Sequence, residues 1–227
     1  METIVITGAN RGIGLGLTRC FANAGHHVIA ACRQPDTAEA LRAIKGSVEV
    51  RKLDVGDAES VAAFVRHLGE RSVDVLINNA GIMGRTAQGI ADMDYAAWSR
   101  TFEINTLAPF RLATQLLPNL KKAVRPRVIT VSSQMGAFGL EMGAGMYAYR
   151  SSKSAVSKVM QVLALELRPD NIIVCPVHPG WVQTDMGGPN AQITVEQSAA
   201  GLFNLVTGLT MAESGRFWTW DGREHVW

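Results

Sequence analysis

The chain has 227 residues, of which 47% are hydrophobic and 19% charged, and its formal net charge is +2. This length suits one sizeable domain or two small ones, and the near-neutral charge gives no sign of a nucleic-acid or anionic-membrane partner. The opening residues METIVITGAN resemble a strand rather than a signal peptide, and no apolar run approaches the roughly 18 residues of a membrane span. Three scattered cysteines, Cys20, Cys32 and Cys175, form no CxxC pair. We therefore expect a reduced, cytoplasmic protein with neither a membrane nor a nucleic-acid partner.

Short apolar runs rich in β-branched residues alternate with segments of helical period along the whole chain. Strands are expected at residues 3–7, 27–32, 48–55, 73–79, 127–133, 172–180 and 216–220. Helices are expected at residues 13–24, 37–44, 58–68, 96–122, 151–167 and 195–209. Pro109 and Pro118 should bend or shorten the fourth helix. Buried strands alternating with amphipathic helices predict a doubly wound α/β fold, and no linker or repeat divides residues 1–227.

The first strand is followed by a glycine-rich turn that contains Gly8, Gly12 and Gly14. Their spacing, G-x-x-x-G-x-G, departs from the G-x-G-x-x-G dinucleotide fingerprint. The physical role is the same, because glycines permit a tight turn and the helix that follows offers free N–H groups to a phosphate. A glycine turn alone is a weak signal, since turns use glycine for steric reasons, but its place between a strand and a helix favours a dinucleotide site.

The end of the second strand bears on which dinucleotide is bound. Many dinucleotide sites place an acid there to hold the ribose 2′-hydroxyl, whereas this chain has Cys32 and Arg33. Arg33 can pair with a 2′-phosphate, and Arg11 in the glycine turn is a second cation. Both arginines could instead be solvated surface residues, and Asp36 weakens the case slightly. We predict NADP as the cofactor, with NADPH preferred over NADH.

Six motifs in a fixed order carry a family resemblance. They are TGANRGIG at residues 7–14, LDV at 53–55, NNAG at 78–81, VSS at 131–133, YRSSK at 149–153 and HPGWVQT at 178–184. Over nearly its whole length the chain resembles the short-chain dehydrogenase/reductase family, and in particular the carbonyl-reductase subgroup that contains the C-factor and sniffer proteins. The resemblance implies one NAD(P)-binding Rossmann-like domain with a seven-stranded parallel sheet in the order 3-2-1-4-5-6-7.

The chemistry centres on Tyr149 and Lys153, which the helical spacing i, i+4 places on one face. Carbonyl reduction needs a proton donor, and an unperturbed phenol titrates near ~10. A nearby ammonium lowers a phenol's pKa, so we expect Lys153 to tune Tyr149. By the resemblance, Ser133 orients the carbonyl, although by composition Ser132 could do so. Asn105 holds a water for proton relay in the family, although an asparagine in a helix can also bend it through a hydrogen bond.

The resemblance also implies the cofactor contacts. They are Gly8, Asn10, Arg11, Gly12, Ile13, Gly14, Arg33, Asp54, Val55, Asn79, Ala80, Gly81, Tyr149, Lys153, Pro179, Gly180, Val182 and Thr184. Asp54 could also cap the helix that begins near Gly56. No cluster of His, Cys and Asp has metal-ligand spacing, so no metal is expected.

Substrate choice is expected to depend on residues 134–145 and on the segment after Thr184. Ser133 and Tyr149 are 16 positions apart, a few more than the family usually has. Methionines at 135, 142, 146 and 186 suggest hydrophobic carbonyls as partners, or simply loop packing. Family members often pair through the long helices, so the resemblance also offers a homodimer or homotetramer, although residues 134–145 could change that interface. An NADP(H)-binding regulatory or signalling protein of the C-factor type is the alternative function, while an extended epimerase is disfavoured by length.

Overall fold

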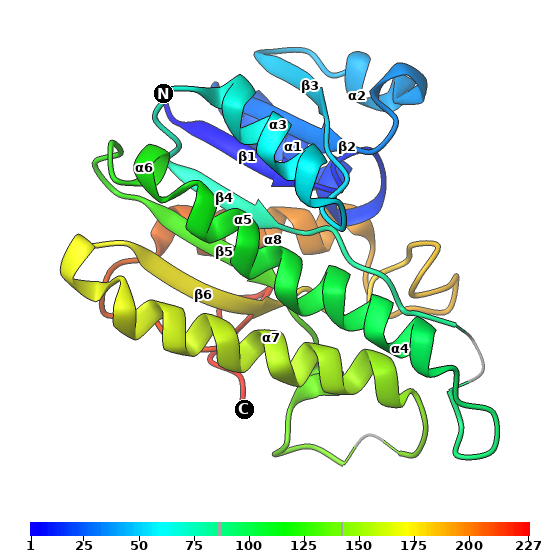
Figure 1. Ribbon diagram of the computed structural model, residues 1–227. Coiled ribbons are helices and arrows are strands. Elements are labelled where there is room, and N and C mark those ends of the chain that lie inside the picture. The colour runs from blue at the N-terminus through cyan, green and yellow to red at the C-terminus, as the bar shows by residue number, and fades with distance from the viewer. Residues whose placement is uncertain (86–87, 142) are drawn as a thin grey trace.

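The structure is a computed structural model that describes residues 1–85, 88–141 and 143–227. Seven parallel strands form one sheet in the order β3-β2-β1-β4-β5-β6-β7 (Figure 1). The strands are β1 (Thr3–Thr7), β2 (His27–Cys32), β3 (Val48–Lys52), β4 (Val75–Asn78), β5 (Arg127–Val131), β6 (Ile173–His178) and β7 (Trp218–Thr219). The predicted doubly wound α/β fold and strand order are confirmed.

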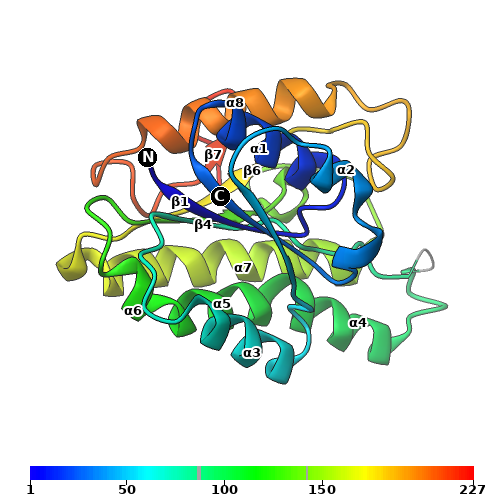
Figure 2. The ribbon, with the colours of Figure 1, turned by 90° about the horizontal axis from the view of Figure 1, so that it is seen from above.

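Helices cover both faces of this sheet (Figure 2). On one side lie α1 (Gly12–Asn23), α2 (Glu39–Arg42) and α8 (Val195–Gly208). On the other side lie α3 (Ala58–Leu68), α4 (Tyr95–Phe102), α5 (Ala108–Gln115), α6 (Leu117–Leu120) and α7 (Tyr147–Glu166). Short helical turns are η1 (Pro35–Thr37), the π-helical η2 (Glu103–Leu107), η3 (Gln134–Gly136) and η4 (Arg168–Asp170). Within the described ranges, no helix is long and apolar enough to cross a membrane.

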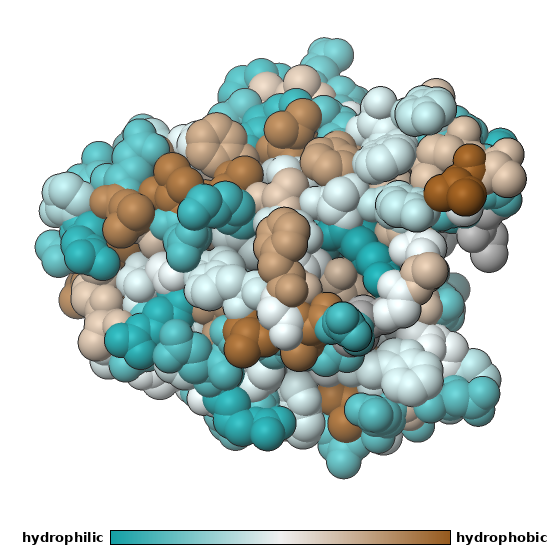
Figure 3. Space-filling view, turned by 90° about the horizontal axis from the view of Figure 1, so that it is seen from below, coloured by the Kyte–Doolittle hydropathy of each residue, from teal (hydrophilic) through white to brown (hydrophobic). Residues whose placement is uncertain are grey.

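The two faces of the sheet supply two separate parts of the core. In β1, Ile4 and Ile6 belong to the cluster beneath α1 and α8, whereas Val5 belongs to the cluster beneath α3, α5 and α7. All three side chains are 0% exposed. Burial on both faces explains why the strands read as continuous apolar runs instead of alternating ones. Seen from below the view of Figure 1, hydrophobic side chains on the surface stand in separate groups among hydrophilic ones (Figure 3).

Two predicted helices differ from the observed ones. The segment predicted at 37–44 forms only η1 and the four-residue α2. The long helix predicted at 96–122 is divided into α4, η2, α5 and α6. Pro109 explains the π-helical turn, because it has no N–H for the carbonyl of Asn105 four residues earlier. Pro118 stands in the first turn of α6, so both prolines shorten the helix as predicted.

The order of the sheet creates a crevice. Strand β1 pairs with β2 on one side and with β4 on the other, so the connections that leave β1 and β4 go to opposite faces. In open α/β sheets such a point leaves room above the carboxyl ends of the strands for a ligand. The motif residues after β1, β4, β5 and β6 are all at this edge.

Candidate active site

A cavity of about 420 Å³, here called the central pocket, lies at the carboxyl edge of the sheet. It is lined by these predicted residues: Gly8, Asn10, Arg11, Gly12, Ile13, Arg33, Asp54, Val55, Asn79, Ala80, Gly81, Tyr149, Lys153, Pro179 and Thr184. Segments that are far apart in sequence therefore meet at one site. Of the remaining predicted residues, Gly14, Gly180 and Val182 are not on the wall of this pocket, nor are Asn105 and Ser133.

The glycine turn forms one wall of the central pocket. Gly8 and Gly12 have φ values of 63° and 51°, in the left-handed region that favours glycine. A Cβ on Gly8 would lie 3.0 Å from the Cα of Ala80, and a Cβ on Gly14 would lie 2.4 Å from the carbonyl oxygen of Gly8. Gly14 therefore acts inside the turn, where it lets α1 approach the strand. The first turn of α1 has no side-chain cap, so its N–H groups remain available to a phosphate.

The turn after β4 is fixed against the glycine turn. The hydroxyl of Thr7 accepts the backbone N–H groups of Asn79 and Ala80, each at 3.0 Å. In return, the side-chain amide of Asn79 donates to the carbonyls of Thr7 and Gly8, at 2.9 and 3.1 Å. These bonds bring the NNAG motif to the pocket wall. The side-chain amide of Asn79 is therefore used to bind backbone carbonyls of the glycine turn.

The two predicted phosphate-binding cations differ in their surroundings. Arg33 is exposed at the end of β2 and has no ion-pair partner among the described residues. Arg11 instead pairs with Asp185, with 2.5 Å between Nη1 and Oδ2, and both side chains are largely exposed. Asp185 was not predicted, although it directly follows the Thr184 motif position. The pair links the glycine turn to the segment after β6 across the pocket.

Tyr149 and Lys153 lie in α7, which begins earlier than predicted, at Tyr147. They are only 7% and 6% exposed, and the ammonium lies 5.8 Å from the centre of the phenol ring. The Lys153 ammonium donates to the carbonyl of Val131 at 2.8 Å. The predicted i, i+4 pair is thus formed on one buried face of a helix.

Burial dominates the titration of both groups. It raises the pKa of Tyr149 above its usual value, against the opposing effect of a hydrogen bond with Ser133. It lowers the pKa of Lys153 to about 8. The net pKa of Tyr149 is therefore raised and not lowered as expected, because desolvation outweighs any lowering by the ammonium. A raised pKa keeps the phenol protonated at neutral pH, the state that a proton donor needs.

Two adjacent serines after β5 make different contacts. The Ser132 hydroxyl lies 2.7 Å from the Ser157 hydroxyl and donates to the carbonyl of Lys153 at 3.1 Å. It is thus bonded to α7, even though Ser132 contributes to the pocket wall. The Ser133 hydroxyl is hydrogen-bonded to Tyr149 and accepts the N–H of Met135 at 3.1 Å. Ser133 is the serine that faces the phenol.

Asn105 lies in the π-helical turn η2 and is 1% exposed. Its side chain accepts the N–H of Ile82 at 2.9 Å and donates to the carbonyl of the same residue at 2.8 Å. It also donates to the hydroxyl of Ser152 at 3.0 Å. A Cβ on Gly81 would lie 3.2 Å from Asn105 Oδ1 and 3.5 Å from Lys153 Nζ. The asparagine and the lysine therefore approach the same backbone.

Gln88 is a functional candidate that the sequence analysis missed. Helix α7 begins after Met146, whose φ is 57° and whose side chain makes no cap bond. The side-chain oxygen of Gln88 instead accepts the backbone N–H of Tyr149 at 3.2 Å. Its amide donates to the carbonyls of Met83 and Arg85, at 2.8 and 2.7 Å. A loop 61 residues away in sequence thus caps the helix at the tyrosine. No local motif signals this role.

Several other assignments can be compared with the structure. Asp54 does not cap α3, because Asp57 does so through the N–H of Glu59; Asp54 accepts the N–H of Gly56 at 2.9 Å instead. Met186, one of the methionines expected near the substrate, lines the pocket, as do the apolar residues Leu53, Ile82, Ile104, Val131 and Val195, which were not named as site residues. Met142 lies outside the described residues. Within the described ranges there is no group of three or more His, Cys, Asp or Glu side chains placed to hold a metal ion.

Comparisons with known proteins agree with this architecture. The family model for short chain dehydrogenase matches residues 2–193. The C-signal protein of Myxococcus xanthus is 41% identical over 165 residues, 73% of this chain and 99% of that protein.

Two solved structures align with this chain over 100% of its length and over 100% of their own length. They are the carbonyl reductase Sniffer of D. melanogaster, with a TM-score of 0.94 and 31% identity, and a carbonyl reductase from Pseudomonas aeruginosa PAO1 in complex with NADP, with a TM-score of 0.89 and 34% identity. The chain belongs to the short-chain dehydrogenase family.

Proposed function

We propose that the chain is an NADPH-dependent oxidoreductase that transfers hydride between the nicotinamide and a carbonyl or alcohol substrate, with residues 1–227 acting as one NAD(P)-binding domain. The observation that carries this proposal is the placement of Tyr149 and Lys153, both nearly buried, on the wall of a pocket that they share with the glycine turn. Burial, a fixed spacing and a ligand cavity coincide at this one site. Perturbed titratable groups in a cleft are typical of active sites.

Each residue near the tyrosine has a separate task in this proposal. When bound, NADPH supplies the hydride. Tyr149 donates the proton to the carbonyl oxygen, and Ser133 holds that oxygen by hydrogen bonding as its charge develops. Lys153 stabilises the phenolate that remains, since an ammonium favours a nearby anion. Asn105 keeps the turn after β4 in register with the lysine and takes part in returning the proton.

NADPH is favoured by the cations at the far end of the pocket. Arg33 is free to pair with a 2′-phosphate, and an acid that would select the 2′-hydroxyl is absent at the end of β2, where Cys32 and Arg33 stand. Arg11 adds positive charge once it leaves Asp185. The start of α1 and the glycine turn suit a pyrophosphate, because the first N–H groups of α1 have no side-chain cap and Gly8 and Gly12 carry no side chain.

The reacting carbonyl is expected on an apolar part of the substrate. Ile82, Ile104 and Met186 line the central pocket, and methionine adapts to ligands of varied shape. This supports aldehydes or ketones with a hydrophobic group beside the carbonyl.

A regulatory role is the second candidate, and the relative named C-signal is the observation that favours it. A protein that only binds NADP(H) would not need a buried ammonium beside a buried phenol. We therefore place catalysis first, and a signal generated through catalysis is compatible with it.

The decisive experiment follows NADPH oxidation with a panel of aldehydes, ketones and quinones. Tyr149→Phe should lower kcat by about a thousandfold, the range of general acid catalysis, while the Kd of NADPH changes little. Tyr147→Phe is the matched control, because Tyr147 lies two positions away and is 42% exposed. Turnover that survives in Tyr149→Phe would refute the acid role. Tight NADPH binding without turnover of any compound would favour the regulatory candidate.

A further inference from the structure

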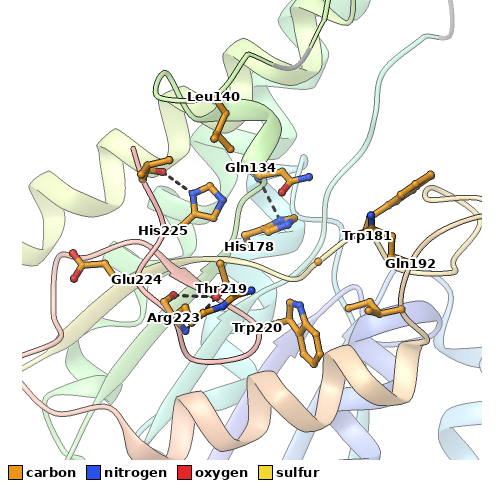
Figure 4. A pocket seen from close by; sticks show the side chains of 13 residues that line it. Gln134, Leu140, His178, Trp181, Gln192, Thr219, Trp220, Arg223, Glu224 and His225 are labelled. Atoms are coloured by element: carbon orange, nitrogen blue, oxygen red, sulfur yellow. Dashed lines mark hydrogen bonds between the residues drawn. The ribbon is translucent and has the colours of Figure 1, made fainter.

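A second cavity, here called the edge pocket, lies beside the ends of β6 and β7 and has a volume of about 360 Å³. This is within the usual range for small-molecule sites. Its wall combines η3, the end of β6, the segment between β6 and α8, and the residues after β7 (Figure 4). Among the side chains on this wall are Gln134, His178, Trp181, Gln192, Trp220 and His225, and Thr219, Arg223 and Glu224 also line it.

The edge pocket adjoins the reaction site through two short stretches of backbone. Gln134 follows Ser133, and Gly180 follows Pro179, which lines the central pocket. Gly180 has a φ of 89°, and a Cβ there would lie 2.4 Å from Ile193 and 3.0 Å from the Trp220 ring. Glycine thus lets the chain pass between the two pockets. The edge pocket thus begins one residue along the chain from Ser133 and one residue from Pro179.

Two imidazoles offer a donor and an acceptor to this space. Nδ1 of His178 accepts the N–H of Gln134 at 3.3 Å, so its proton resides on Nε2. The side chain is 7% exposed, and burial lowers its pKa to about 4, with His225 contributing in the same direction. Nδ1 of His225 lies 2.6 Å from the carbonyl of Val226, which places the proton on Nδ1 and leaves Nε2 as an acceptor. Neither Nε2 has a hydrogen bond to any described residue.

The remaining unpaired polar groups are uncharged. The side-chain amides of Gln134 and Gln192 make no hydrogen bond to any residue that the structure describes. The charged groups at the rim are instead matched. Arg223 pairs with Asp221 at 2.7 Å, and Glu224 pairs with Arg216 at 3.1 Å. An ionic ligand would have to compete with these internal partners, whereas a neutral polar ligand would not.

We propose that the edge pocket binds the remote part of the carbonyl substrate, and that this part is uncharged and carries both hydrogen-bond donors and acceptors, as amide and hydroxyl groups do. The inference rests on the proposed function and extends it. The substrate has an apolar segment at the carbonyl and a neutral polar segment at its other end. The indoles of Trp181 and Trp220 cover the flat faces of such a group, while the imidazoles and amides bind its edge.

The test uses aryl aldehydes that share one core and one tail length. Their tails end in a primary amide, a carboxylate, a trimethylammonium or a tert-butyl group. With NADPH, the amide aldehyde should have a kcat/KM at least fivefold above the other three. Gln192→Leu and His225→Phe should each lower the ratio of kcat/KM for the amide aldehyde over the tail-free aldehyde by about fivefold, the effect of one neutral hydrogen bond. Gln115→Leu, the same change at an exposed glutamine in α5, should leave the ratio unchanged.

A binding measurement separates this inference from the proposed function. The amide compound with methyl in place of the aldehyde is titrated calorimetrically into the NADP-loaded protein and into both variants. Weaker binding to the variants supports the edge pocket even if no aldehyde turns over, in which case only the proposed function fails. Turnover with a preference for a charged or alkyl tail, or with a ratio that neither variant changes, refutes this inference alone.

Discussion

The two ends of the central pocket differ in how far their charged side chains are exposed to water. At the nucleotide end, Arg11 and Arg33 carry their charges in water. At the reaction end, Tyr149 and Lys153 are more than nine-tenths buried. An exposed charge costs little to keep, whereas a buried ammonium loses its hydration and destabilises the fold. Residues that bind the cofactor can therefore be changed at little cost in stability. The reacting groups, in contrast, are kept at a cost to the stability of the fold.

The largest effect that would test this contrast is on stability. Below pH about 8, Lys153 is protonated in both the folded and unfolded chains, so the full burial penalty applies. Between about 8 and 10.5, the unfolded chain keeps a proton that the folded one has lost, so wild-type stability rises with pH. Lys153→Met should therefore raise the free energy of unfolding at pH 7 by about 2 kcal/mol, after about 1 kcal/mol is subtracted for the lost bond to Val131. Activity should fall.

Urea denaturation of the cofactor-free protein at several pH values measures this effect. The advantage of the variant should disappear as the pH approaches 10.5, the ordinary lysine value. Lys158→Met, an exposed lysine in the same helix, should show no such pH-dependent difference. A Lys153→Met protein that is no more stable than wild type at pH 7 would break the contrast between the two ends.

Arg33→Ala tests the nucleotide end. A charge-assisted hydrogen bond contributes about 1.5–3 kcal/mol, so the Kd of NADPH should rise by about 10- to 100-fold. The Kd of NADH and the free energy of unfolding should change little. Fluorescence titration with both cofactors measures the shift, and Arg66→Ala on α3 is the control. An equal loss of affinity for NADH would show that Arg33 does not bind the 2′-phosphate.

Gln88→Ala sharpens the contrast at the reaction end. Loss of the acceptor for the Tyr149 N–H should let the start of α7 fray and lower kcat about five- to tenfold. The Kd of NADPH should stay the same, since the glycine turn is untouched. Gln88→Glu keeps an acceptor for that N–H and should recover part of kcat. Steady-state kinetics with both variants measure these effects. A KM for NADPH that rises while kcat stays unchanged would contradict the positioning role.

Asp185→Asn should have the smallest effect. Removing the partner of Arg11 frees its charge for NADPH and should lower the Kd about two- to threefold, because exposed ion pairs contribute little. The gain should vanish at high salt. Titrations at two salt concentrations measure it, and a similar gain for NADH would assign the effect to something other than the 2′-phosphate.

The parts of the site that short motifs encode could be predicted from the sequence. Gly8 and Asn79 lie directly after strands, so their meeting at one edge follows from the parallel sheet. The cap from Gln88 could not be foreseen, because it depends on how a loop folds back over α7. The tyrosine pKa was misjudged for a related reason, since spacing reveals the ammonium but not the depth of burial. The edge pocket needs residues after β7 to approach η3, which no local pattern encodes.

The π-helical turn at Glu103–Leu107 has a consequence for how this chain tolerates change. A π-helical turn holds about one residue more than an α-helical turn. Deleting one residue there would narrow the turn, but Pro109 would remain and would still leave a carbonyl one turn earlier without its N–H partner. Asn105 would leave Ile82 and Ser152, its present partners. The deletion would thus remove the contacts of Asn105 beside Lys153 without giving a regular helix, so the site depends on the extra residue in this turn.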